Sequence, residues 1–300
     1  MSRIVFFGNE QLAQGLERPA TPIFDALITG GYEIAAVVLP RDPSSKSRPD
    51  SKPAIITAAE ENHVPIIFAD QLADLDETLR EIDAEIGILA SYGQMVPQST
   101  IEVFPHGIVN IHPSLLPKYR GSTPIETAIS SGDQETGVSL MNLVKEMDAG
   151  GIFAQEKLQL NGSESKQALY EKLASLGAKL LIETLPAILS GDSSATPQND
   201  NEATYTEKLT KDSGFLDPTI MTAGECERKI RAYFGFPRTR MGFLGQETII
   251  TAARVLENYA GDDWPDVVKC SGNTFLQIQK LISPKSGKEM TMGEYLRGLK

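Results

Sequence analysis

The first half of the chain alternates short apolar runs with longer segments whose apolar residues recur at helical spacing. The apolar runs predict strands at residues 4–7, 34–39, 65–68, 86–90 and 108–111, and the segments between them predict helices at 22–29, 54–61 and 72–82. Strands that alternate with helices are typical of a parallel sheet covered by helices on both faces. We therefore expect an α/β fold whose first domain contains a Rossmann-like, mostly parallel sheet.

The hydrophobic pattern changes after residue 189. Before it, the pattern predicts a helix at 125–130 opened by Pro124, strands at 137–144 and 152–160, and a long amphipathic helix at 165–189. Residues 190–204 are almost wholly small or polar and can bury little apolar surface. A helix near 223–233 and alternating runs near 248–255, 267–269 and 274–282 then predict a small β-barrel. The expected domains are 1–189, a linker at 190–206, and an OB-like C-terminal domain at 207–300.

Composition and charge narrow the class of protein. Hydrophobic content of 41% and interspersed charges indicate a soluble globular protein, and no apolar run reaches the ~18 residues of a membrane span. We expect a cytoplasmic protein with no membrane partner. The net charge of −12 is unevenly distributed, since residues 1–204 hold 14 basic and 28 acidic side chains whereas residues 205–300 hold 14 and 12. The C-terminal third is therefore the more suitable place for a polyanion.

The cysteines and histidines form no pattern that indicates a metal site or a disulfide framework. Cys226 and Cys270 are far apart in the sequence and lack a C-x-x-C partner, which favours two reduced structural thiols. The three histidines form no H-E-x-x-H motif. We expect no metal.

The turn after the first predicted strand lacks the motifs of nucleotide-binding sheets. Gly8 is followed by Asn9-Glu10-Gln11, so the G-x-G-x-x-G loop is absent, as are a P-loop and a G-x-S-x-G elbow elsewhere in the sequence. These absences disfavour a dinucleotide cofactor, a P-loop phosphate site and a serine hydrolase.

Asn110 and His112 alternate with apolar residues at the end of a predicted strand, so both project from one face of the sheet. Ligands of open parallel sheets bind beyond the carboxyl ends of the strands. An amide and an imidazole at such an end form a candidate site, although a pair that satisfies local backbone groups explains the fragment equally well.

The loop that follows also contains candidate binding groups. Pro113 and Pro117 restrict the apolar loop between them, which could wall a flat ligand. Lys118 and Arg120 flank an aromatic ring and suit anionic or ribose-phosphate groups, whereas a solvated turn is the simpler interpretation.

Asp148 lies in the sequence Met-Asp-Ala-Gly-Gly. By composition it is a turn aspartate. However, the two glycines let the backbone approach a ligand, and a carboxylate in a partly dry cleft could accept a proton.

The ordered motifs Asn110-Ile-His112-Pro-Ser-Leu-Leu-Pro-Lys-Tyr-Arg-Gly121, Gly-Val-Ser-Leu-Met141 and Met-Asp148-Ala-Gly resemble the folate-dependent formyltransferase family over nearly the whole chain. The resemblance implies catalysis by Asn110, His112 and Asp148, with 10-formyltetrahydrofolate as co-substrate. It also implies that the donor is bound by the loop of Ser114, Leu115, Leu116 and Pro117. In the implied reaction Asn110 and a donating His112 stabilise an oxyanion, while Asp148 orients His112 and helps to move a proton.

The acceptor is indicated by the segment after the linker. Tyr205-Thr-Glu-Lys-Leu-Thr-Lys211 looks like the Y-A-E-K-[LI] segment of methionyl-tRNA formyltransferases, and Arg231-Ala-Tyr-Phe-Gly-Phe-Pro237 resembles the arginine-aromatic-proline segment that follows it there. The resemblance implies an enzyme that formylates initiator methionyl-tRNA for translation initiation. We expect the C-terminal domain to contact the tRNA, and we expect a monomer. The residues expected to contact the tRNA are Arg41, Lys46, Arg48, Lys52 and Arg120.

The sequence departs from the family pattern in three places. The turn at 8–11 replaces a Gly-Thr-Pro segment, the 40–53 loop carries Asp42 and Asp50 among its cations, and Phe236-Pro237 stands where Trp-Pro is common. Because of the first departure, we do not carry over the substrate contacts that the family makes with that turn. Because of the second, binding of the 40–53 loop to the acceptor arm of the tRNA is expected to be weaker or differently placed.

Three other functions fit part of the pattern. A formyltransferase acting on an amino-sugar nucleotide shares the three catalytic residues and the loop, although residues 207–209 favour tRNA. A glycinamide-ribonucleotide formyltransferase resembles only the first domain. An inactive folate- or tRNA-binding homologue would lose the catalytic residues, which are all present here.

Overall fold

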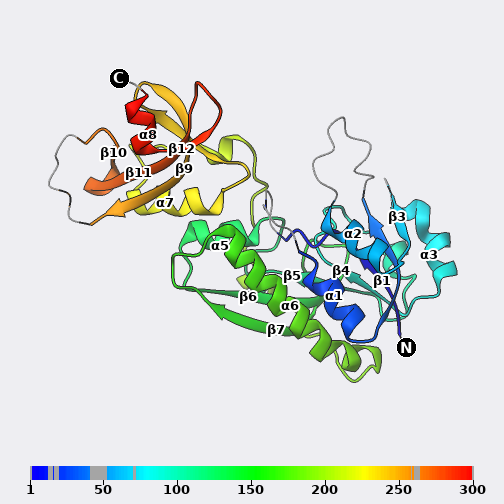
Figure 1. Cartoon of the computed structure of the whole chain (residues 1–300). Helices are drawn as coiled ribbons and strands as arrows, with labels where there is room; N and C mark the ends of the chain where they lie inside the picture. Colours follow the sequence, from blue (N-terminus) through cyan, green and yellow to red (C-terminus); the bar gives the residue numbers. More distant parts are fainter. Residues whose placement is uncertain are drawn as a thin grey trace. The chain divides into compact units, whose positions relative to one another are not determined.

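The computed structural model describes residues 2–12, 16, 20–40, 53–69, 72–257, 259 and 264–298. The chain divides into two compact units (Figure 1). Unit 1 comprises Met1–Pro124, Glu135–Gln159 and Gln167–Glu207, and unit 2 comprises Ile125–Gln134, Leu160–Lys166 and Lys208–Lys300. Unit 2 therefore includes two short segments, Ile125–Gln134 and Leu160–Lys166, which the domains expected from sequence assign to the first domain.

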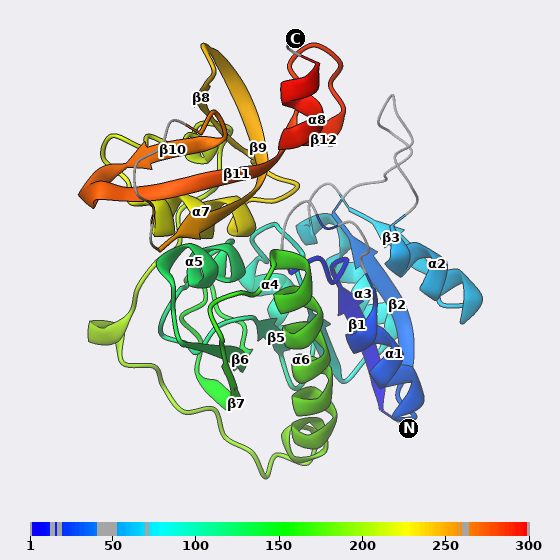
Figure 2. The ribbon, with the colours of Figure 1, turned by 60° about the vertical axis from the view of Figure 1, so that its left-hand side comes forward.

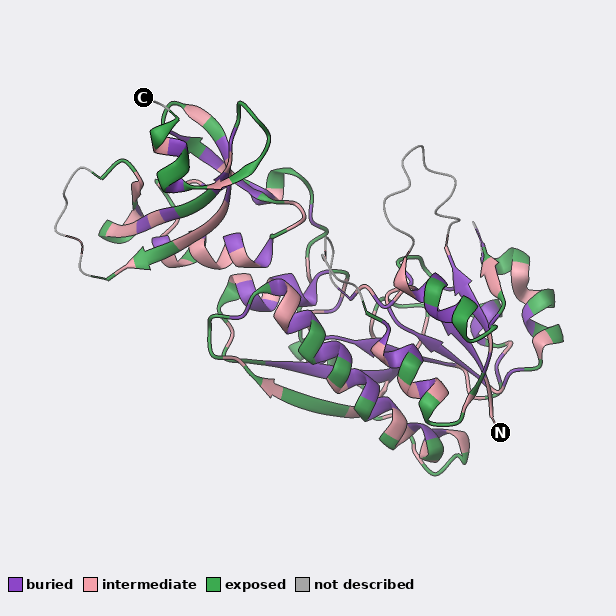
Figure 3. Cartoon of the chain, in the orientation of Figure 1, coloured by how far each residue is buried: buried purple, intermediate pink, exposed green. Residues whose placement is uncertain are grey.

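Unit 1 is built on a seven-stranded sheet with the order β3-β2-β1-β4-β5-β6-β7. The strands are β1 (Arg3–Phe7), β2 (Glu33–Leu39), β3 (Ile66–Phe68), β4 (Ile86–Leu89), β5 (Ile108–His112), β6 (Glu135–Asn142) and β7 (Ile152–Gln159). The first five strands pair in parallel, and β6 and β7 are antiparallel. The central strands are buried on both faces (Figure 3), as their unbroken apolar runs require. The expected α/β fold with a mostly parallel sheet is confirmed.

The helices of unit 1 follow the strands in βαβ order. They are α1 (Pro22–Thr29), α2 (Ala54–Glu61), the 3-10 turn η2 (Leu72–Leu75), α3 (Asp76–Ile82), α4 (Gln98–Ile101) and α6 (Lys166–Leu189). Figure 2 shows α1 and α6 on one face of the sheet and α3 and α4 on the other. The buried carboxylate of Glu10 accepts hydrogen bonds from the backbone N–H groups of Ile23 and Phe24, at 2.9 and 2.7 Å, and so fixes the chain after β1 to the start of α1. No helix among these described parts of the chain is long and apolar enough to cross a membrane.

Unit 2 contains a curled antiparallel sheet, a half-barrel, with the order β10-β11-β9-β8 and with β12 paired to β11. Its elements are most of α5 (Pro124–Ser131), η4 (Asp212–Gly214), α7 (Ala223–Ala232), β8 (Thr239–Phe243), β9 (Gln246–Leu256), β10 (Val267–Cys270), η5 (Ser271–Asn273), β11 (Thr274–Ile282), β12 (Glu289–Thr291) and α8 (Met292–Arg297). The expected small barrel is confirmed, and β8, β12 and α8 add to the elements predicted.

The core of unit 2 brings together residues that are distant in sequence. Cys226 on α7 and Cys270 at the end of β10 are buried free thiols that contact each other within this core. A capping box between Thr222 and Glu225 begins α7, because each side chain bonds the backbone N–H of the other residue.

The segment 190–206, expected to be a linker, runs along unit 1 and is hydrogen-bonded to it. Thr196 pairs with Ile152 at the start of β7, and Tyr205 pairs with Arg120. A short 3-10 turn, η3 (Asp200–Glu202), lies between these two bridges. Low apolar content therefore does not leave this segment without contacts, since backbone pairs hold it.

Candidate functional site

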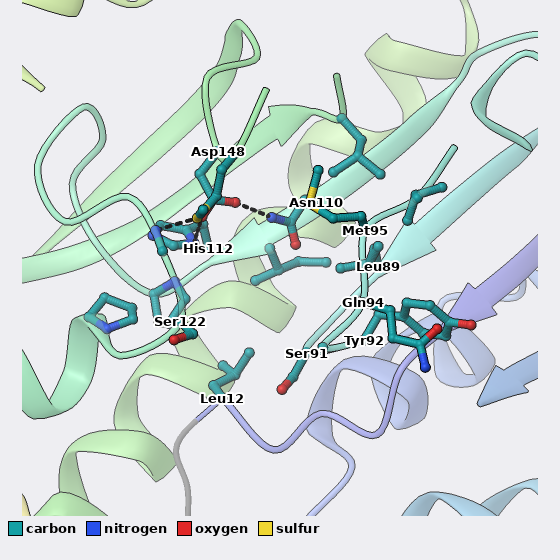
Figure 4. A pocket seen from close by; sticks show the side chains of 18 of the residues that line it. Leu12, Leu89, Ser91, Tyr92, Gln94, Met95, Asn110, His112, Ser122 and Asp148 are labelled. Carbon is teal, nitrogen blue, oxygen red and sulfur yellow. Dashed lines mark hydrogen bonds and ion pairs between the residues drawn. The ribbon is translucent and has the colours of Figure 1, made fainter. Parts of the chain in front are cut away.

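A cavity of about 310 Å³ opens at the carboxyl ends of β4 and β5 (Figure 4). Its walls come from Leu12, from the end of β4 and residues 91–96 after it, from residues 110–113 at the end of β5, from Gly121, Ser122 and Pro124, and from residues 143, 144 and 146–148 after β6. This is where an open parallel sheet binds its ligands, and the volume suits a small organic molecule.

Asn110 and His112 reach this cavity from the same face of β5. Both side chains are nearly buried, with residue exposures of 6% and 4%. The sheet positions them rigidly, because β5 pairs with β4 on one side and β6 on the other. The alternation in the sequence correctly placed these two polar groups together.

Asp148 meets them from the loop between β6 and β7. Its Oδ1 accepts a hydrogen bond from Asn110 Nδ2 at 3.3 Å, and its Oδ2 accepts one from the Gly121 backbone N–H at 2.8 Å. The same Oδ2 lies 3.8 Å from His112 Nδ1. Asp148 has a backbone φ of +48°, in the left-handed region that aspartate tolerates better than most residues. The structure thus brings the three predicted catalytic side chains together at one wall of the cavity.

The second nitrogen of His112 defines its tautomer. Nε2 lies 2.9 Å from the backbone carbonyl oxygen of Tyr119. A carbonyl can only accept, so Nε2 carries the hydrogen of the ring and Nδ1 is the nitrogen that faces Asp148. Sequence reasoning expected Asp148 to orient His112 and missed this carbonyl, because a backbone partner has no sequence signal.

The arrangement can stabilise negative charge and move a proton. The amide of Asn110 has two N–H groups, of which one bonds Asp148, and the amide lines the cavity. Protonated at Nδ1, His112 would be paired with the carboxylate of Asp148 and would present positive charge at the same wall. Amide and imidazolium donors at a buried site are the groups that stabilise a developing oxyanion.

The predicted donor-binding loop lies next to this cavity but outside its lining. Ser114 and Leu116 are buried, and Ser139 Oγ links them by donating to the Ser114 carbonyl at 2.6 Å while accepting from Leu116 N–H at 3.0 Å. Gln155 Nε2 donates to the Leu116 carbonyl at 2.9 Å. Of residues 113–117, only Pro113 lines the cavity. Direct contact of residues 114–117 with a ligand stays a prediction.

The residues expected to contact tRNA are placed only in part. Arg41, Lys46, Arg48 and Lys52 lie outside the described residues. Arg120 is 2% exposed, although the sequence indicated either a cation that suits anionic groups or part of a solvated turn. Its guanidinium donates to Gln198 Oε1 and Asp200 Oδ1, because the backbone of Arg120 pairs with the segment 190–206. In the structure Arg120 therefore holds that segment, and its contact with tRNA stays a prediction.

Several lining residues were missed by the sequence reasoning. The segment 91–96 contributes Tyr92, whose burial raises the pKa of its phenol to about 12 and keeps it protonated. Met95 and Met147 are large apolar side chains that are 63% and 54% exposed at the cavity. The rule that ligands bind beyond parallel strand ends, applied to β4 as well as β5, would have found the first of these segments.

The side chains that commonly bind metal ions are scattered in the structure. Within the described ranges, no group of three or more histidine, cysteine, aspartate or glutamate side chains is placed to hold a metal ion.

Known proteins share both the sequence and the fold. The Formyl transferase family matches residues 3–185. The methionyl-tRNA formyltransferase of Lactobacillus acidophilus is 33% identical over 99% of this chain and 96% of its own, and that of Chloroflexus aggregans is 37% identical over 84% and 80%. Among solved structures, an N-formyltransferase from Helicobacter canadensis, in complex with folinic acid and dTDP-3-aminofucose, has a TM-score of 0.69. It is 18% identical over 93% of this chain and 99% of that one, which is a likeness of fold.

Proposed function

This chain belongs to the folate-dependent formyltransferase family, among the methionyl-tRNA formyltransferases, and we propose that it transfers the formyl group of 10-formyltetrahydrofolate to initiator methionyl-tRNA. The observation that carries the reaction is the convergence of Asn110, His112 and Asp148 at one cavity wall. We further propose that the enzyme is cytoplasmic, that it is a monomer, and that it acts in translation initiation.

The walls of the cavity fit the donor. Leu12, Leu89, Val96 and Leu143 supply apolar surface, and the opening lies beside the three polar side chains. A flat pterin ring can be buried against such walls while its substituent reaches the end of β5. The donor is a co-substrate, and the apolar residues of the wall have to bind and orient it.

The reaction needs charge stabilisation and one proton transfer. The free amine of the methionyl group attacks the formyl carbon, a new C–N bond forms, and the bond from that carbon to N10 of the folate breaks. The amide of Asn110 donates to the formyl oxygen as negative charge develops on it. The amine loses a proton and N10 gains one, and His112 Nδ1, held against Asp148, is the group placed to carry it.

The acceptor is tested by offering three amines with the same donor. Purified protein is given 10-formyltetrahydrofolate and either charged initiator tRNA, an amino-sugar nucleotide or glycinamide ribonucleotide, and formylated product is measured by mass. We expect product with the tRNA alone, because the similarity to methionyl-tRNA formyltransferases covers 99% of this chain, including unit 2. Formylation of the amino sugar without formylation of tRNA would replace the first proposal by its alternative.

Gly150→Ala tests whether the Asp148 loop must lie where the structure has it. A Cβ at Gly150 would stand 1.8 Å from the backbone oxygen of Asn142, so the loop has to move away from β6. Displacing Asp148 in this way is expected to lower kcat at least about tenfold, since misplacement by about 1 Å can cost 10²-fold. The control is Gly242→Ala in β8, where an added Cβ meets nothing within 4 Å. Equal kcat values for the two variants would refute the requirement.

A further inference from the structure

Gln198 lies in the segment 190–206 and makes four hydrogen bonds with its side chain. Nε2 donates to the backbone carbonyls of Asp148 and Gly150, at 2.8 and 2.7 Å. Oε1 accepts from Arg120 Nε and Nη2, at 3.1 and 2.9 Å. The orientation of the amide is defined by its partners, because carbonyls can only accept and a guanidinium can only donate. The amide of Gln198 is therefore fully engaged.

The first pair of bonds holds the turn that carries Asp148. The positive φ of Asp148, in the left-handed region, is unfavourable for a non-glycine residue and persists only where the surroundings impose it. The bonds to the carbonyls on either side of Ala149 brace this turn from outside the cavity. The carboxylate of Asp148 is left to contact Asn110, Gly121 and His112.

The second pair of bonds holds the segment that orients His112. Arg120 stands between Tyr119, whose carbonyl faces His112 Nε2, and Gly121, whose N–H bonds Asp148. Arg120 is also held by Asp200 Oδ1 at 2.7 Å and by a bond of 3.3 Å to the Tyr205 hydroxyl. The side chain of Gln198 thus joins the turn at Asp148 to residues 119–121. The relative position of these two loops decides the distance between Asp148 and His112.

We propose that Gln198 is a positioning residue for formyl transfer, which sets the Asp148 turn against the Tyr119–Gly121 segment. It touches no substrate in this role and acts through backbone carbonyls and Arg120. The expected effect on kcat rests on the proposed function. The expected effect on the position of Asp148 does not rest on it.

Two variants separate the role of Gln198 in positioning from a role in merely tethering the segment. Gln198→Ala removes all four bonds. Gln198→Glu keeps an acceptor for Arg120 but replaces the donor by a carboxylate that faces two carbonyls. If positioning is the role, both variants lower kcat at least about tenfold, while KM for donor and acceptor changes less than about threefold. If tethering through Arg120 is the role, the glutamate variant keeps normal kcat, which overturns the proposal.

Asp200→Ala is the matched control. It removes a contact of Arg120 on the same segment and leaves the amide of Gln198 intact. The side chain of Asp200 is 80% exposed, so little else depends on it. We expect its kcat to stay within about twofold of the parent, because bonds of exposed side chains contribute little. A loss as large as that of Gln198→Ala would assign the effect to Arg120 and overturn the proposal.

Hydrogen exchange of the Gly121 amide gives a readout that needs no substrate. This N–H bonds Asp148 Oδ2, whereas the Arg120 amide bonds the carbonyl of Thr204 and the Thr206 amide bonds the carbonyl of Arg120. In both Gln198 variants of the full chain, we expect the Gly121 amide to exchange at least about tenfold faster, with the other two within about threefold.

The exchange experiment separates the two proposals. If the parent protein formylates no tRNA, the proposed acceptor is wrong, yet faster exchange at Gly121 still supports the positioning of Asp148. Unchanged exchange at Gly121 overturns the role of Gln198 whatever the acceptor. Equal acceleration at all three amides would show that the segment simply detaches, and it would overturn the proposal as well.

Discussion

Replacing Asn110 by alanine is expected to lower kcat by about 10²- to 10³-fold, the typical loss when one oxyanion donor is removed. The amide lies near the end of β5 and lines the cavity, and alanine has no N–H in its side chain to replace it. His112→Ala should lower kcat to a similar extent, because it removes the imidazole whose Nδ1 lies 3.8 Å from Asp148 Oδ2 and which we propose carries the proton. In each case KM for the donor should change little, since these groups act as charge develops.

Steady-state kinetics with unfolding curves decides this prediction. Each variant loses a hydrogen bond, so we expect a stability loss of only about 1 kcal/mol and a folded protein. Asn62→Ala is the matched control, because it removes an exposed amide that only bonds the Ala58 carbonyl at the end of α2. Turnover near that of the parent in Asn110→Ala or in His112→Ala would show that the corresponding residue is not catalytic.

Lys166→Met is expected to lower the free energy of unfolding by about 3–5 kcal/mol, the usual cost of removing one partner of a buried ion pair. Lys166 and Glu126 are each only 1% exposed, with Nζ 3.8 Å from Oε1, and Nζ also donates to the Phe236 carbonyl at 3.1 Å. Methionine fills the volume of the lysine chain but removes the ammonium group that faces the buried Glu126 carboxylate. The double variant Lys166→Met/Glu126→Gln should lose less free energy of unfolding than Lys166→Met alone.

The control for this pair lies on α6 itself. Lys179 and Glu183 are also 3.8 Å apart, but their side chains are 70% and 59% exposed. Lys179→Met should therefore change stability by less than about 0.5 kcal/mol. Denaturant unfolding of the three variants measures the difference. If Lys166→Met and Lys179→Met cost the same, burial of the first pair has no energetic consequence.

Glu126→Gln alone gives a further variant, and its loss of stability should depend on pH. Burial lowers the pKa of Lys166 from 10.5 to about 8, and Glu126 opposes that shift. A lowered lysine pKa means that the folded state disfavours the charged form, so this group contributes more stability as pH rises from about 8 toward 10.5. Without the Glu126 carboxylate the pKa of Lys166 falls further, so the free energy of unfolding of the variant is lowest below pH 8. We expect its destabilisation to be smaller at pH 9.5 than at pH 7, and a pH-independent difference would contradict this pairing.

The local pattern of apolar residues predicted most of unit 1. The bounds expected for α1 and α2 match those found, and the strands differ by a residue or two. Unit 2 was predicted less completely. In β8, Thr239, Met241 and Phe243 are buried and alternate with Arg240 and Gly242, a pattern too short and too polar to stand out from a loop.

The candidate site was predicted as residue types rather than as geometry. The strand alternation placed Asn110 and His112 on one face, and the resemblance added Asp148, which composition alone made a turn residue. The carbonyl of Tyr119, the turn at Gly150 and the side chain of Gln198 could not be predicted, because their contacts join loops far apart in the sequence.

By itself, the sequence determined the α/β class, the half-barrel that follows, and the family, because burial periodicity and motif order are properties of neighbouring residues. Only the tertiary structure decided which nitrogen of His112 faces Asp148, that Ser114–Pro117 is not part of the cavity lining, and that the segment 190–206 braces the Asp148 turn. The physical reason is that hydrogen-bond partners are chosen by distance in space, across sheet edges and loops, and leave no periodic trace along the chain.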